Sequence, residues 1–152
     1  MTDATATTSS AIGALPAEWT DRYVRLLGVE REAPGWDALA RLARAHLLSV
    51  PFESVTSVLR RRAHPDGAVP PLDPAALLTA WEERRAGALC FDAAEMVSRL
   101  LAELGYRAYP TAGRIGWPGS HQAVVAELDG GRAMVDVGNG APFFEPIPLD
   151  GE

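Results

Sequence analysis

The sequence has a single cysteine, no lysine and no long hydrophobic run. One thiol excludes an internal disulfide and a cysteine-based zinc site, so Cys90 is either an inert core residue or a nucleophile. No apolar stretch approaches the roughly 20 residues of a membrane-spanning helix, and we expect no membrane association. The first ten residues lack the basic and apolar segments of a secretory signal. We therefore expect a cytoplasmic protein.

Positive charges are in the minority, because 14 arginines stand against 20 acidic residues and the net charge is −6. The one cluster of arginines is the run Arg60-Arg61-Arg62, for which we expect a solvated loop. Binding to nucleic acid needs a basic stripe that neutralises phosphates. The sequence therefore argues against a nucleic-acid partner.

The hydrophobic pattern changes from a helical period to alternation near residue 105. The spacing predicts helices over residues 16–27, 36–48 and 90–104, and another that begins at Asp73-Pro74 and ends before residue 86. It predicts strands over residues 106–115, 121–128 and 132–137, with turns at 116–120 and 129–131. Helices followed by an antiparallel sheet indicate an α+β fold, in about one domain's length of chain.

Cys90 lies at the expected start of the last helix, on its apolar face. A cysteine on such a face is more often inert core than a nucleophile. A free thiol has a pKa of about 8.5, and its thiolate is the reactive form. The free N–H groups and positive end of a helix stabilise an anion there. An imidazole oriented by a carboxylate would complete the activation of the thiol.

The expected hairpin supplies an imidazole and a carboxylate, those of His121 and Asp136. If residues 129–130 form a two-residue loop, His121 lies opposite Gly138. Asp136 is then the diagonal neighbour of His121 on the same face, about 7–8 Å away and within reach of a side-chain hydrogen bond. The pattern predicts this pair, whereas its proximity to Cys90 does not follow from the pattern.

The other two histidines have plainer interpretations. His46 falls on the apolar face of the second expected helix, which predicts a buried histidine with a hydrogen-bond partner. His64 lies in a loop rich in proline and glycine and is expected to be exposed. Three histidines far apart and one cysteine make no convincing ligand set, so we expect no metal site.

Several sequence blocks, in one order, resemble the arylamine N-acetyltransferases. The family's Gly-Gly-x-Cys-Phe-Glu motif is matched by Gly87-Ala88-Leu89-Cys90-Phe91-Asp92. Its Thr-His and Asp-Val-Gly-Phe-Gly are matched by Ser120-His121 and Asp136-Val137-Gly138-Asn139-Gly140. Further similarity lies at residues 23–28, 45–54, 104–106, 114–115 and 143–149.

The resemblance implies the family's fold, a helical domain followed by a β domain around a core like that of papain and the transglutaminases. We expect a disordered tail over residues 1–15, a helical domain over 16–104 that ends in the nucleophile helix, and a β domain over 105–152. Because the family continues into a third domain, we expect this β domain to be incomplete and the third domain to be absent.

The resemblance also implies acyl transfer through a thioester on Cys90. Acetyl-CoA would be the acyl donor, with no tightly bound cofactor, and an arylamine or hydrazine would be the acceptor. His121 would act as base and acid, and Asp136 would hold its tautomer. Backbone N–H groups near Cys90 would stabilise the oxyanion.

Three other functions remain open at this point. The chain could be an amide synthase for polyketide-type acyl chains, which would use the same thiol chemistry. It could be a transglutaminase- or peptidase-like enzyme, which would share the triad. The third alternative is an inactive truncated homologue. The sequence also leaves the oligomeric state open.

Overall fold

The structure, a computed structural model, describes residues 13–139 and 144–150. The helices in these residues are α1 (Ala17–Leu27), α2 (Trp36–Ser49), α3 (Val55–Arg62), α4 (Pro74–Arg84) and α5 (Cys90–Glu103). The strands are β1 (Arg107–Ile115), β2 (Trp117–Leu128), β3 (Gly131–Val135) and β4 (Ile147–Pro148). They form one antiparallel sheet in the order β1-β2-β3-β4. The expected α+β fold is confirmed.

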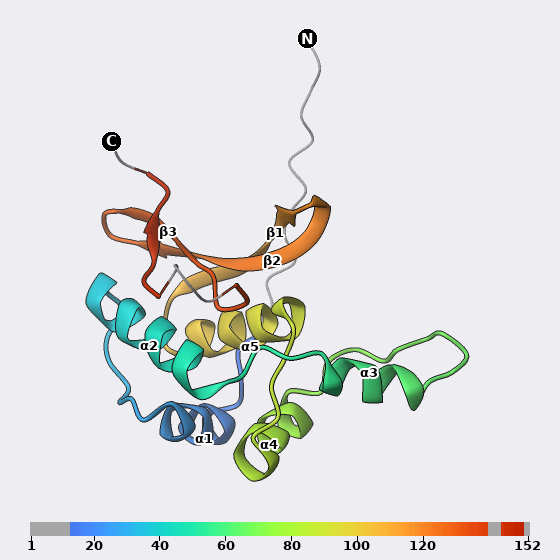
Figure 1. The fold of residues 1–152 in the computed structure, drawn as a ribbon. Helices are drawn as coiled ribbons and strands as arrows, with labels where there is room; N and C mark the ends of the chain where they lie inside the picture. Colours follow the sequence, from blue (N-terminus) through green and yellow to red (C-terminus); the bar gives the residue numbers. More distant parts are fainter. Residues whose placement is uncertain (1–12, 140–143, 151–152) are drawn as a thin grey trace.

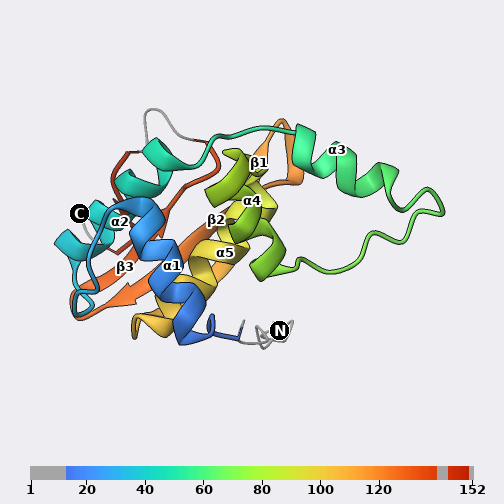
Figure 2. The same ribbon diagram turned by 90° about the horizontal axis from the view of Figure 1, so that it is seen from below.

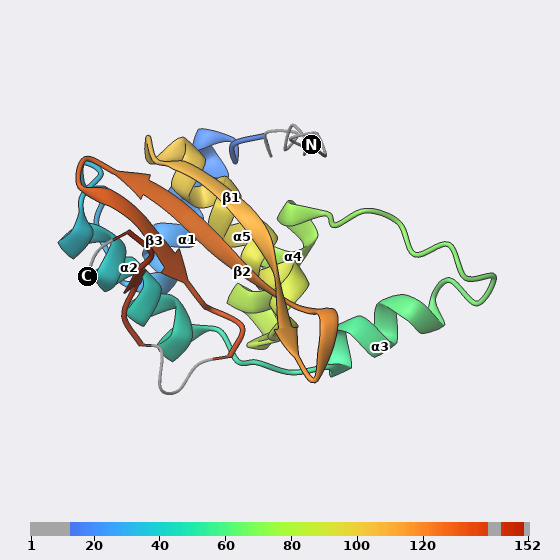
Figure 3. The same cartoon turned by 90° about the horizontal axis from the view of Figure 1, so that it is seen from above.

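Helix α5 lies directly beneath the sheet and separates it from α1 and α4 (Figures 1 and 3). One hydrophobic cluster runs through both layers, because Leu100 of α5, Leu39 of α2 and Val124 of β2 are all fully buried members of it. The division at residue 104 into a helical and a β domain stays a prediction. None of the described helices has the length and apolarity of a membrane span.

The helix ends follow local signals in the sequence. Helix α1 ends at Gly28, which adopts a left-handed φ of 67° that side chains disfavour. Helix α4 begins after Asp73, whose carboxylate accepts hydrogen bonds from the N–H groups of Ala75 and Ala76. Helix α5 is followed by Gly105, with a φ of 91°. These three predictions are confirmed.

Two loop predictions were wrong. The arginine run ends helix α3, which projects sideways from the body of the molecule (Figure 2). The apolar stripe of this helix is only Val55, Val58 and Leu59, too short to outweigh the charges in the pattern. The turn expected over residues 116–120 is confined to Gly116, because Trp117 already pairs with Ile115 across the hairpin.

The start of the packed chain also differs from expectation. Residues 1–12 of the expected tail lie outside the described residues. Leu15 is buried in the core, and its N–H donates to the carbonyl of Arg99 in α5 at 3.2 Å. The ordered part of the chain therefore begins before Pro16.

His46 is the buried core histidine that the sequence predicts. Its Nδ1 lies 2.7 Å from the hydroxyl of Tyr23, and its ring packs edge-on against Trp81. Burial lowers the pKa of His46 to about 3 and raises that of Tyr23 well above its usual value. A neutral hydroxyl and a neutral imidazole therefore share this hydrogen bond. His64 is exposed, as expected.

We expect His46 to make the protein less stable in acid. The unfolded chain binds a proton at His46 below a pKa of about 6.5, whereas the folded protein keeps this imidazole neutral down to about pH 3. The free energy of unfolding should therefore fall by about 1.4 kcal/mol per pH unit below pH 6.5. Urea unfolding of wild type and His46→Gln at a series of pH values checks this.

The difference in the free energy of unfolding between wild type and His46→Gln should be largest at neutral pH and should decrease as pH falls. His64→Gln is the matched control, because His64 is exposed, and its gap to wild type should stay flat. A gap for His46→Gln that does not change with pH would contradict the prediction.

Candidate active site

Cys90 is the first residue of helix α5 and is buried. Leu89 before it has an extended backbone, with ψ at 168°, so the chain enters the helix from a strand-like segment. The first N–H groups of a helix lack acceptors within the helix. Cys90 therefore lies at the positive end of the helix dipole, among N–H groups that have no acceptor within the helix, as its place in the sequence predicts.

His121 and Asp136 form the pair that the hairpin pattern predicts. Leu128 pairs with Gly131, so residues 129–130 are the two-residue loop on which the prediction rested. Nε2 of His121 lies 2.9 Å from Oδ2 of Asp136, and both side chains are buried. The carboxylate accepts this hydrogen bond, so the proton is on Nε2 and Nδ1 is free to take a proton.

Asp136 is itself held in place by the chain that follows it. Its Oδ1 accepts hydrogen bonds from the N–H groups of Gly138 at 3.1 Å and Asn139 at 2.9 Å. Both oxygens of the carboxylate are therefore engaged, one by backbone and one by the imidazole. This arrangement leaves Asp136 little freedom to turn away from His121.

Gly138 shows how close Cys90 comes to the imidazole. A Cβ built on Gly138 would lie 2.5 Å from Cβ of Cys90 and 3.2 Å from Cε1 of His121. The distance between Cβ of Cys90 and Cε1 of His121 is therefore at most the sum of these two distances. The imidazole edge that carries Cε1 therefore lies close to Cys90. A glycine is required at 138 for this approach.

Cys90 and His121 open into one cleft of about 520 Å³. Its rim carries exposed apolar side chains, with Phe52 61%, Ile115 52% and Trp117 69% exposed. The residues around the cleft are Leu47, Val50, Phe52, Cys90, Ile115, Trp117, Ser120, His121, Val137, Gly138 and Asn139. A cleft of this size and apolar character suits a small aromatic or acyl group.

No cluster of three or more potential metal ligands occurs among residues 13–139 and 144–150. The chemistry that the cleft offers is instead that of a thiol, a base and a carboxylate. A nucleophile, a base beside it and a group that orients the base are the parts of an acyl-transfer site.

A family model described as N-acetyltransferase matches residues 36–152, most of the chain. The chain belongs to the arylamine N-acetyltransferase family. Among curated proteins, it is 30% identical to the proansamycin X synthase of Amycolatopsis mediterranei, over 74% of this chain and 45% of that protein. It is 33% identical to an arylamine N-acetyltransferase of Mycobacterium tuberculosis, over 70% of this chain and 40% of that protein.

A solved structure agrees with this placement. The Mycobacterium marinum arylamine N-acetyltransferase in complex with CoA matches 88% of this chain and 51% of its own, with a TM-score of 0.70 and 26% identity. The chain thus spans about half the length of the family members it matches. The family resemblance predicted from the sequence motifs is confirmed.

Sequence reasoning missed some residues that shape this site. Gly138 and Gly113 were given no role of their own, although a Cβ on Gly113 would lie 3.3 Å from the ring of His121. Phe52 and Trp117 were not expected at the cleft. Their exposure is unusual for large apolar side chains, yet nothing in the local pattern distinguishes them from core residues.

Proposed function

We propose that this chain transfers an acyl group through a thioester on Cys90, with acetyl from acetyl-CoA as the acyl group and an arylamine or hydrazine as the acceptor. The observation that carries the proposal is the cleft that contains both the buried thiol of Cys90 and the imidazole of His121, which is hydrogen-bonded to the carboxylate of Asp136. Membership of the family adds support. The M. marinum relative, whose structure contains CoA, supports the choice of donor.

The proposed reaction has two steps with one base. First, His121 Nδ1 takes the thiol proton, Sγ of Cys90 attacks the acetyl carbonyl, and the bond from that carbonyl to the sulfur of CoA breaks. The proton passes from His121 to the departing thiolate. The amine then attacks the Cys90 thioester and gives its proton to His121, the bond between the acyl carbon and Sγ breaks, and His121 returns the proton to Sγ, which restores the thiol.

Two groups support the triad in this proposal. Asp136 keeps the proton of His121 on Nε2, so that Nδ1 is available as the base. The N–H of Cys90, at the first position of α5, is a candidate donor to the oxyanion of each tetrahedral intermediate. Cys90, His121 and Asp136 are accordingly the proposed catalytic residues, and the cytoplasm is the proposed compartment.

Amide synthesis on a larger acyl chain is a second candidate. It is favoured by the match to a curated protein named as a synthase rather than an acetyltransferase. The apolar rim of the cleft, with Phe52 and Trp117 exposed, would accept a larger acyl group as well as an acetyl group. Both candidates share the thioester on Cys90 and differ in the donor.

The experiment is to incubate the protein with acetyl-CoA and measure its intact mass. We expect one acetyl group on wild type and none on Cys90→Ala. A second sample is treated with iodoacetamide near neutral pH, which tests the thiol without any acyl donor. A reactive thiol that takes no acetyl from acetyl-CoA favours the second candidate. No adduct together with an unreactive thiol contradicts every enzymatic function.

A further inference from the structure

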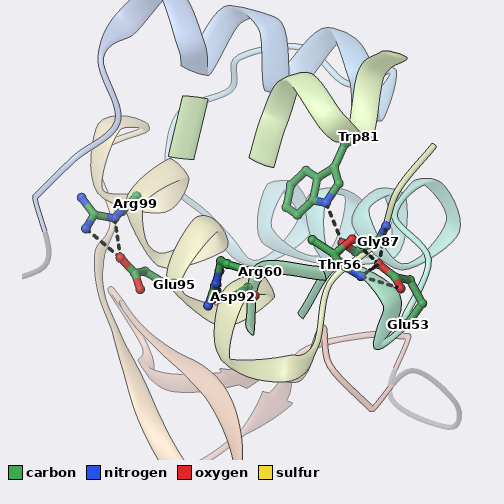
Figure 4. Close-up of polar contacts among 8 residues, drawn as sticks. All are labelled: Glu53, Thr56, Arg60, Trp81, Gly87, Asp92, Glu95 and Arg99. Carbon is green, nitrogen blue, oxygen red and sulfur yellow. Dashed lines mark hydrogen bonds and ion pairs between the residues drawn. The ribbon is translucent and has the colours of Figure 1, made fainter. Parts of the chain in front are cut away.

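Gly87 and Ala88, just before the start of α5 at Cys90, have all of their backbone N–H and carbonyl groups hydrogen-bonded. The N–H of Gly87 donates to Oε1 of Glu53 at 3.1 Å, and its carbonyl accepts from Nε1 of Trp81 at 3.3 Å (Figure 4). The N–H of Ala88 donates to the carbonyl of Pro51 at 3.1 Å, and its carbonyl accepts from the N–H of Glu53 at 3.2 Å. Residues 87–88 are therefore held by hydrogen bonds to residues 51–53 and to Trp81, just before α5 begins.

The carboxylate of Glu53 joins this segment to the start of α3. Besides Gly87, it accepts hydrogen bonds from the N–H of Val55 and from both the N–H and the hydroxyl of Thr56. Burial raises the pKa of Glu53, and the hydrogen bonds from Thr56, Gly87 and Val55 lower it further than burial raises it. Glu53 thus stays a carboxylate, an acceptor for donors from two separate parts of the chain.

The last turn of α3 forms an ion pair with the first turn of α5. Arg60 donates from both terminal nitrogens to Oδ1 of Asp92, each at 3.2 Å (Figure 4). Asp92 is the third residue of α5, and its side chain is only 11% exposed. A carboxylate this deeply buried needs a partner charge, so the ion pair fixes where α3 and α5 meet.

Helix α3 buries none of its own side chains. Its place in the fold is therefore set by polar contacts at its two ends rather than by apolar packing. Those contacts fall on Gly87 and Asp92, which flank Cys90 on either side. We propose that Glu53 and Arg60 are positioning residues, which through α3 hold the backbone of Cys90 in the geometry that acyl transfer needs. This inference rests on the proposed function.

The backbone of Cys90 matters because of its N–H. An acyl carbonyl attacked by Sγ becomes an oxyanion, and a backbone N–H stabilises it only when aimed at that position. A shift of about 1 Å can lower such a rate by about 100-fold. Alkylation of the same thiol by iodoacetamide passes through no oxyanion, so it reports on the thiol and His121 alone. Comparing the two reactions separates positioning from general damage.

The test uses the full chain, with p-nitrophenyl acetate as an acetyl donor that requires no recognition of CoA. Sγ of Cys90 attacks the ester, p-nitrophenolate leaves, and the thiol proton goes to His121. For Glu53→Gln and Arg60→Gln we expect acylation to slow by about 10- to 100-fold while alkylation changes by less than about threefold. Glu83→Gln and Arg62→Gln, at exposed positions, are the matched controls.

Arg60→Gln leaves Asp92 without its cation, and this variant can fail to fold. The double variant Arg60→Gln/Asp92→Asn removes both charges, and we expect it to fold and to acylate as slowly as Glu53→Gln. Acylation at the wild-type rate in these variants, or acylation and alkylation falling together, would overturn the inference. A wild-type thiol that is alkylated but takes no acetyl from p-nitrophenyl acetate would instead count against the proposed function.

Discussion

Replacing Asp136 with asparagine is expected to slow the acylation of Cys90 by roughly 10³- to 10⁴-fold. The cause is the tautomer of His121. Oδ1 of Asp136 accepts two backbone N–H groups, so an asparagine keeps its oxygen on that side. Its NH₂ group then faces Nε2 of His121, which must become an acceptor. The proton moves to Nδ1, and the nitrogen proposed to take the thiol proton can no longer act as a base.

The rate of acylation by acetyl-CoA, measured in a single turnover, checks this expectation. Asp129→Asn makes the same change at an exposed position in the loop of the same hairpin, and it should leave the rate unchanged. The free energy of unfolding of Asp136→Asn should stay near that of wild type, because the side chain keeps its shape. A rate within about tenfold of wild type would mean that Asp136 does not set the tautomer.

The second large effect is on stability and comes from Gly87→Ala. A Cβ at this position would lie 1.9 Å from the carbonyl oxygen of Pro51 and 2.7 Å from Cγ of Glu53. The contact with Pro51 is to backbone, which cannot rotate aside as a side chain can. The two segments must separate, and with them go the hydrogen bonds that join Gly87 and Ala88 to residues 51–53. We expect a loss of about 3 kcal/mol in the free energy of unfolding.

Urea unfolding at equilibrium measures this loss. Gly130→Ala is the matched control, because a Cβ there has no atom within 4 Å and its change should be within about 0.5 kcal/mol. We also expect Gly87→Ala to acylate poorly even where it is folded, since the displaced segment leads directly to Cys90. If the variant is as stable as the control, the segments have room to adjust and the contact is not structural.

The His121–Asp136 pair shows what a sequence pattern can predict about a site. Side chains alternate along a strand, and a two-residue loop sets which residues are opposite each other. From these two facts the same-face position of the two side chains follows without any tertiary contact. The register found across the hairpin agrees with that derivation.

The contacts around Cys90 cannot be predicted from such local patterns. Glu53 and Gly87 are 34 residues apart, and Arg60 and Asp92 are 32 residues apart. No period of 2 or 3.6 residues relates positions at these separations. The polar composition of the arginine run predicts a solvated loop, whereas Arg60 reaches a buried carboxylate only once α3 has docked beside α5.

The sequence alone therefore determines the end of α1, the start of α4, the end of α5, the hairpin register, and the place of Cys90 at the start of a helix, because these depend on residues within a few positions of one another. Tertiary structure alone decided that the imidazole comes to the thiol, through the close approach of Gly138 to Cys90. It also decided that Glu53 and Arg60 hold the segment around Cys90. These contacts join segments distant in sequence, and they form only when burial of the shared core brings α5, α3 and the sheet together.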